Sequence, residues 1–227
     1  MIELSAYKLV DLSHDILNDM PTWNTNCGFS LSITQDHHPE EEFSFKVQRL
    51  NTPAGIGTHM DAPAHCFKDA LTIDALPLNT LFNPCVMIDV SKDADENFLL
   101  SEQHLKTWEK QHGRIEKNSL AIIHTGWGRL WPKPAYRNDL RFPAIGLDAA
   151  RFLLMRDIRG LGIDTLSVDR PDSSFVVHRE ILGAHRFIIE NVAHADLLPE
   201  IGSYALSLPL KIIGATEAPM RLVAFVP

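Results

Sequence analysis

Short apolar runs separated by polar turns are the feature that most constrains how this chain can fold. Each run is only a few residues long and rich in Ile, Val and Leu, which predicts buried strands. Helical spacing of apolar residues between these runs predicts helices at Ser101–His112 and Leu147–Asp157, the first capped by Ser101 and ended by Gly113. The strands expected in this part are Cys85–Val90, Leu120–Thr125, Gly160–Asp164 and Phe187–Val192.

The two ends of the chain have a β-rich pattern. Lys8–Ser13 predicts a first strand, and apolar residues alternate with polar or small ones over Phe29–Ile33 and Phe43–Val47, the period of half-buried strands. The charged segment between them, Asp36–Glu42, is expected to be an exposed turn. At the other end, a pair of strands at Leu210–Thr216 and Arg221–Val226 is expected to close the domain. The order favours one mixed α/β domain over residues 1–227.

Composition excludes several classes of partner. Of the 227 residues, 45% are apolar, which allows a sizeable core, and the net charge of −8 comes without a basic stripe. Nucleic acid and membranes are therefore not expected as partners. The N-terminus has no signal-peptide pattern, and no apolar stretch approaches the roughly 20 residues that span a bilayer. Three scattered cysteines suit a reducing cytoplasm, the expected location.

The stretch G-I-G-T-H-M-D-A-P-A-H-C, Gly55–Cys66, concentrates side chains that bind metals or carry protons. In an extended segment His59 and Asp61 point to the same side, where an imidazole and a carboxylate can share Zn²⁺ or Mn²⁺. His65 would then lie at the rim of the site, where an imidazole can exchange a proton near neutral pH. The alternative is a loop of solvated polar residues without a metal.

A second cluster consists of His178 and Glu190. Glu190 interrupts the apolar run F-I-I-E-N-V, and a buried carboxylate is costly unless it is paired or bound to a metal. The alternative is that Glu190 reaches solvent at the end of a strand or pairs with Arg186 or Arg221.

With these residues in view, the chain resembles the cyclase family of metal-dependent hydrolases, whose best-known members are bacterial kynurenine formamidases. The family carries the motif H-x-G-T-H-x-D-x-P-x-H, and Gly57–His65 matches all of it except its start. The match continues along nearly the whole chain, through D-L-S-H-D-I, M-P-T-W, H-T-G-W, G-I-D-T-L-S-V-D, H-R-E-I-L, I-I-E-N-V and A-P-M-R-L-V-A.

The resemblance implies a swivelling β/β/α fold with a metal centre, in a homo-oligomer such as a dimer or tetramer. It makes His59 and Asp61 metal ligands. With two metals bound, it implies that Asp61 and Glu190 bridge them and that His178 binds the second. It also implies that His65 is the general acid/base. Trp23, the last of the candidate site residues, would line the substrate pocket.

One departure from the family motif concerns Gly55, which stands where the motif has its first histidine. Three outcomes are open: water fills the position, a single ion is held by the remaining ligands, or metal affinity falls so far that the protein is inactive. Compensation by Cys66 is the weakest option. If the rest of the site is intact, histidine at residue 55 is expected to tighten metal binding.

The expected function is metal-dependent hydrolysis of a small amide, cyclic amide or lactone, as in an arylformamidase, with Zn²⁺ as the first choice of metal and Mn²⁺ as the second. Two alternatives are kept, a non-catalytic binding protein that has lost the metal and a metal-dependent lyase or isomerase. The chain has neither the G-x-S-x-G signature of α/β serine hydrolases nor a glycine-rich phosphate loop.

Overall fold

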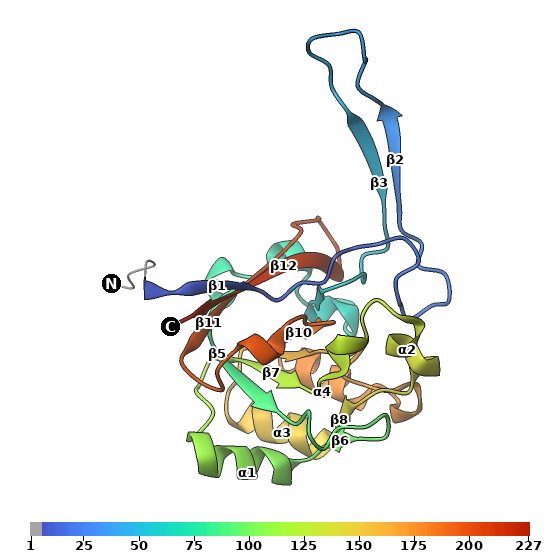
Figure 1. The fold of residues 1–227 in the computed structure, drawn as a ribbon. Coiled ribbons are helices and arrows are strands. Elements are labelled where there is room, and N and C mark those ends of the chain that lie inside the picture. The colour runs from blue at the N-terminus through green and yellow to red at the C-terminus, as the bar shows by residue number, and fades with distance from the viewer. Residues whose placement is uncertain (1–5) are drawn as a thin grey trace.

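A closed sheet forms the centre of the molecule. The computed structural model describes residues 6–227 (Figure 1). Its main sheet has the strand order β1 (Lys8–Asp11), β12 (Glu217–Val226), β11 (Ser203–Pro209), β5 (Phe82–Asp89), β7 (Leu120–His124), β9 (Gly160–Ile163), β10 (Phe187–Glu190) and β4 (His59–Asp61). The short strand β4 also pairs with β12, so the sheet closes into a barrel, with β1 attached along β12.

Helices cover one side of the parallel strands β5, β7, β9 and β10. Figure 1 shows α1 and α3 side by side below the sheet, and contacts join α3 to both α1 and α4. The helices are α1 (Glu102–His112), α2 (Pro134–Arg137), α3 (Leu147–Met155) and α4 (Val176–Gly183), and a small sheet pairs β6 (Leu99–Leu100) with β8 (Ala144–Ile145). Short 3-10 helices lie at Pro63–His65, Ile73–Ala75, Leu78–Thr80, Trp127–Leu130, Asn138–Leu140, Pro171–Ser173 and Ala195–Leu197.

Successive residues of the parallel strands belong to two different cores. Ile123 of β7 packs in the core beneath the helices, together with Leu105 of α1 and Phe152 of α3. Its neighbour Ile122 packs inside the barrel with Met60. Both faces of these strands are therefore apolar, which explains why their sequences are continuous apolar runs and confirms the expected buried strands.

The long helix α1 confirms its predicted boundaries. Ser101 is the N-cap, and its backbone N–H donates to Nδ1 of His104 at 3.0 Å. The helix ends before Gly113, whose φ of +90° lies in the region that glycine enters at no steric cost. The second predicted helix, α3, ends at Met155, two residues before the predicted boundary at Asp157.

The hairpin of β2 (Ser30–Gln35) and β3 (Val47–Asn51) corrects the prediction of half-buried strands. It forms a separate two-stranded sheet that projects away from the barrel, as the upper part of Figure 1 shows. Every residue of both strands is exposed, and Phe43 and Phe45 lie in the exposed segment before β3 at 74% and 62% exposure. The alternating pattern predicted a covered face, whereas nothing in residues 6–227 covers it.

The C-terminal pair of strands was predicted with the wrong first member. Leu210–Thr216 is the connection between β11 and β12, and the strand itself, Ser203–Pro209, precedes it. Arg221–Val226 lies within β12, as predicted. The closing role is also confirmed, because β12 pairs with β11 on one edge and with β1 and β4 on the other.

Candidate metal centre

The three residues of β4 are divided between the barrel interior and the outside. Met60 packs in the interior core, so its neighbours His59 and Asp61 face the opposite side. Both are buried, at 5% and 1% exposure. The expectation that residues two apart share one side is confirmed.

The strand next to β4 adds a carboxylate to the same face. Glu190 lies opposite His59 in the antiparallel register, and Ile189, opposite Met60, packs inside the barrel. Glu190 is buried at 6% exposure, so it does not reach solvent, and Arg186 binds Asp157 instead. The other arginine considered, Arg221, pairs with Asp11.

His178 comes from α4 and completes a compact group of four side chains. Its Nε2 lies 3.4 Å from Glu190 Oε1 and 3.7 Å from Asp61 Oδ2. His59 Nε2 lies 3.5 Å from Glu190 Oε2 and 3.7 Å from Asp61 Oδ1. All four residues singled out as metal ligands therefore converge, with the Glu190 carboxylate spanning the two imidazoles.

Both imidazoles are oriented by a hydrogen bond on their far nitrogen. His59 Nδ1 donates to the carbonyl oxygen of Gly57 at 2.9 Å, and His178 Nδ1 contacts Asp169 Oδ2 at 2.8 Å. The same Gly57 oxygen accepts a hydrogen bond from Asn191 Nδ2. A proton on Nδ1 leaves the Nε2 lone pair free, and this is how metal-binding histidines are held.

The charges of the group suit a cation. Burial alone would lower the pKa of His178, but Asp169, Asp61 and Glu190 together raise it to about 12. Burial likewise opposes the charge on His59, whose pKa is nevertheless raised by Asp61 and Glu190. Burial favours neutral Asp61, yet the histidines beside it lower the pKa of its carboxyl group. Protons on the imidazoles thus balance the negative charge of the carboxylates. A divalent cation would balance the same charge in place of these protons.

An unpaired oxygen supports the same conclusion. Asp61 Oδ1 is fully buried and has no hydrogen-bond partner among residues 6–227. A buried carboxylate oxygen without a partner is destabilising unless something binds it. Imidazole and carboxylate donors fit Zn²⁺ or Mn²⁺. Two sets of three donors with the spacing of a metal site share Asp61, which lies with His65 and His178 in one set and with His59 and Glu217 in the other.

The two other predicted residues line the same cavity. The cavity has a volume of about 610 Å³, and both His65 and Trp23 face it. His65 belongs to the 3-10 helix after β4, is partly exposed, and its ring centroid lies 6.1 Å from that of His178. Trp23 lies against Phe175 with ring centroids 5.7 Å apart, and the ring of Phe175 lies 5.8 Å from that of His178. These positions are compatible with His65 as the general acid/base and with Trp23 as a substrate contact. Both roles stay predictions.

Three further residues belong to the site and were not singled out from the sequence. Asp169 and Asn191 lie inside matched family segments, so a search for the partners of each histidine within those segments could have found them. The third is Glu217 of β12, which lies in the cavity with its Oε2 3.5 Å from His65 Nδ1. No local motif marks Glu217, because the closing of the barrel brings it to the site.

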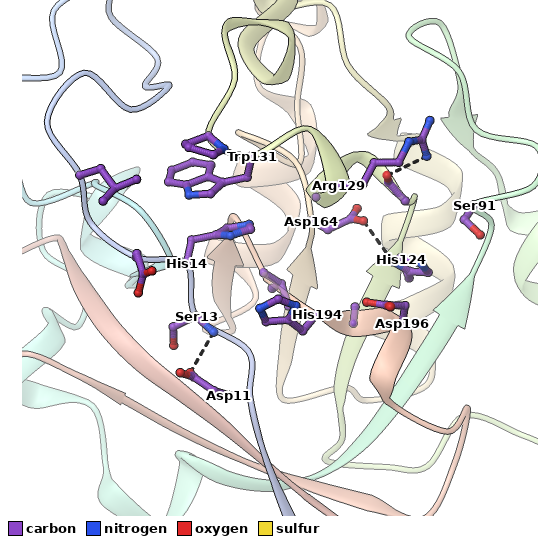
Figure 2. A pocket seen from close by; sticks show the side chains of 17 residues that line it. Asp11, Ser13, His14, Ser91, His124, Arg129, Trp131, Asp164, His194 and Asp196 are labelled. Carbon is purple, nitrogen blue, oxygen red and sulfur yellow. Dashed lines mark hydrogen bonds and ion pairs between the residues drawn. The ribbon is translucent and has the colours of Figure 1, made fainter.

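A second cavity of about 750 Å³ lies at the ends of β5, β7 and β9 (Figure 2). His124 Nδ1 contacts Asp164 Oδ2 at 3.1 Å, and this carboxylate raises the pKa of His124 although burial opposes the charge. His14 stacks on Trp131 at a ring-centroid distance of 4.4 Å. Within residues 6–227, the donor sets spaced to hold a metal all lie in the first cavity.

The helices of residues 6–227 do not include one with the length and apolar character that crossing a bilayer requires.

Comparisons with known proteins agree with this geometry. Residues 10–170 match the family described as "Putative cyclase". The kynurenine formamidase of Bacillus anthracis is 31% identical over 223 residues, which cover 97% of this chain and 98% of that protein. The isatin hydrolase of Roseibium aggregatum is 32% identical over 188 residues, covering 75% of this chain and 71% of that protein.

Solved structures show the same fold. An isatin hydrolase bound to the product analogue thioisatinate superposes with a TM-score of 0.91 at 27% identity, over 99% of this chain and 94% of that one. Isatin hydrolase A from Labrenzia aggregata gives 0.90 at 28% identity, over 98% and 94%. The expected swivelling β/β/α fold is thereby confirmed. The chain belongs to the cyclase family and is an enzyme of the metal-dependent hydrolase class.

Proposed function

We propose that this enzyme hydrolyses a C–N bond outside peptides, in a small aryl amide or cyclic amide, with a divalent metal held by His59, Asp61, His178 and Glu190. The observation that carries the proposal is the convergence of two imidazole Nε2 atoms on two buried carboxylates at the base of a cavity. Two imidazoles with carboxylates suit Zn²⁺, our first choice, and also Mn²⁺.

The shape and lining of the cavity support a planar substrate. Trp23, Phe175 and Leu166 add apolar surface to the lining of the cavity beside the polar ligand group. Its volume of about 610 Å³ is within the range of pockets that bury small ligands. Two of the relatives are named for isatin and for kynurenine, and both compounds contain a planar aromatic ring that carries a carbonyl group. We propose the same class of substrate here, with N-formylkynurenine as one candidate.

The residues of the chain divide the work of the reaction. A metal ion bound at such a base lowers the pKa of water and polarises a carbonyl group. His65, at the rim, takes up a proton as water attacks and returns it to the leaving nitrogen. Glu217 Oε2 lies 3.5 Å from His65 Nδ1, on the side of the imidazole that faces the cavity. Trp23 packs on the face of the substrate and helps to exclude water.

The test combines metal loading with a change of His65. Purified protein loaded with Zn²⁺ or Mn²⁺ is assayed against N-formylkynurenine, isatin and a lactone, with proton release as the readout. His65→Ala is expected to lower kcat by about 10²- to 10⁴-fold, the usual contribution of general acid–base catalysis, while its metal content stays that of the wild type.

Three results would count against the proposal. If the wild-type protein neither binds these metals nor melts at a higher temperature in their presence, the non-catalytic alternative is correct. A metal-loaded protein that leaves every amide and lactone intact points to the lyase or isomerase instead. Loss of the metal from His65→Ala would make His65 a ligand rather than the acid/base.

A further inference from the structure

We infer that Glu217 binds the metal ion as an additional ligand beside His59 and Asp61, in the space that a side chain at residue 55 would otherwise fill. The inference rests on the metal-dependent function proposed above and adds a ligand that the sequence did not reveal.

The register of the barrel places Glu217 on the correct face. Glu217 lies opposite Asp61 where β12 pairs with β4, and the next residue, Ala218, packs inside the barrel. Directly paired residues of antiparallel strands are close neighbours on one face of a sheet. One ligand atom each from His59, Asp61 and Glu217 lies within 4.8 Å of the other two, a spacing that a single metal ion can bridge.

The Glu217 carboxylate has free capacity for a cation. Its charged neighbour within 4 Å, among the residues that the structure describes, is His65 at 3.5 Å. That distance is longer than a good N–H···O hydrogen bond. The adjoining Asp61 Oδ1 is buried and without a partner, so an unsatisfied oxygen points into the same space. An ion bound between the two carboxylates would satisfy both.

The carboxylate of Glu217 occupies the space next to Gly55 in which a side chain at residue 55 would lie. A Cβ atom on residue 55 would lie 2.7 Å from Glu217 Oε2 and 2.9 Å from its Cδ, closer than side chains approach in practice. Glycine at residue 55 therefore leaves the room that the carboxylate occupies. Because these atoms are the far end of a flexible side chain, a histidine at residue 55 would displace the Glu217 carboxylate from this position. Cys66, the other side chain considered as a substitute, is exposed and absent from both donor sets.

A carboxylate in this place changes which metals the site prefers. Glu217 adds a hard oxygen donor and a third negative charge to those of Asp61 and Glu190. Oxygen-rich sets favour Mn²⁺ more than imidazole-rich sets do. Glu217 should therefore contribute more to Mn²⁺ affinity than to Zn²⁺ affinity.

The experiment measures metal binding directly. Protein stripped by a chelator is titrated with Mn²⁺ or Zn²⁺ against a competing chromophoric chelator, for the wild type, Glu217→Gln and the exposed control Glu116→Gln. Glu217→Gln keeps the size of the side chain and removes its charge. We expect its Mn²⁺ dissociation constant to rise at least about tenfold, its Zn²⁺ constant to rise less, and the control to match the wild type.

Variants at residues 55 and 217 give a second, independent test. Gly55→His alone is expected to weaken Mn²⁺ binding because the imidazole displaces the Glu217 carboxylate, and the double variant Gly55→His, Glu217→Gly is expected to share its preference for Zn²⁺. Wild-type Mn²⁺ affinity in Glu217→Gln, or tighter Mn²⁺ binding in Gly55→His alone, would overturn the assignment of Glu217. If the wild type itself binds neither metal, the proposed function fails with it, so the two failures are distinguishable.

Discussion

At the scale of single residues, the predicted ligands are those that lie close together in sequence or carry a visible anomaly. His59 and Asp61 share one extended segment, and Glu190 stands out as a charge within an apolar run. Glu217 has no such signal, because its neighbours in space belong to β4 and its register is set only when the barrel closes. Sequence patterns report local geometry well, and they report contacts between distant strands only through a family motif.

His14 gives a prediction on pH that is independent of the metal centre. Burial, with a smaller contribution from His194, lowers the pKa of His14 to about 4, although Asp164 and Asp15 oppose the shift. Between this value and the unfolded value near 6.5, the unfolded chain binds a proton that the folded chain does not. Stability should therefore fall as the pH drops through this window, by up to about 3 kcal/mol.

His14→Phe tests this prediction because it keeps a ring beside Trp131 and removes the titration. Urea unfolding from pH 7 to pH 4 should show a shallower loss of stability for this variant than for the wild type. His112→Phe, which changes another histidine stacked on a tryptophan, serves as the control and should keep the wild-type slope. Identical slopes in all three proteins would refute the role of His14.

At the scale of elements, the short strand β4 should be sensitive to loss of its one interior side chain. Met60 is fully buried in the barrel core, whereas Met155, at the end of α3, is largely exposed. Met60→Ala should lower the free energy of unfolding by about 2–5 kcal/mol, because it removes buried methylenes and leaves a cavity. Met155→Ala should change it by no more than about 0.5 kcal/mol. Equal midpoints in urea would contradict this account of β4.

Element prediction succeeded where burial on both faces left a continuous apolar run, as in β5 and β7. It failed for the hairpin of β2 and β3. Alternation of apolar and polar residues predicts that one face of a strand is buried, but it does not show which segment packs on that face. Element prediction also placed a strand at Leu210–Thr216, where the apolar residues belong to a connection. Apolar residues alone therefore do not show that a segment is a buried strand, since Leu210, Ile212 and Ile213 of this connection are exposed.

At the scale of the whole molecule, the projecting hairpin is the surface that we expect a second copy of the chain to cover. Large apolar side chains are exposed along it, and an isolated two-stranded hairpin is at best marginally stable in water. The homo-oligomer that the resemblance implies stays a prediction. The apolar side chains exposed on the hairpin are Leu31, Ile33, Phe43, Phe45, Val47 and Leu50.

Light scattering after size exclusion tests this expectation. The wild type should have a multiple of the chain mass of 25.5 kDa, and the double variant Phe43→Ser, Phe45→Ser should shift toward the single chain. Ile213→Ser changes an exposed apolar residue far along the chain from the hairpin and should leave the mass unchanged. A monomeric wild type, or a double variant of unaltered mass, would show that the hairpin has another use.

The closure of the barrel through β4 has a consequence for how the enzyme is held together. The residues proposed to bind the metal come from β4, α4, β10 and β12, so a bound ion would tie together the strands at which the ring closes. Because the site exists only in the folded chain, such an ion would stabilise the fold by its binding free energy and would be released on unfolding. An ion placed there for catalysis would thus also serve as the reversible cross-link of the fold.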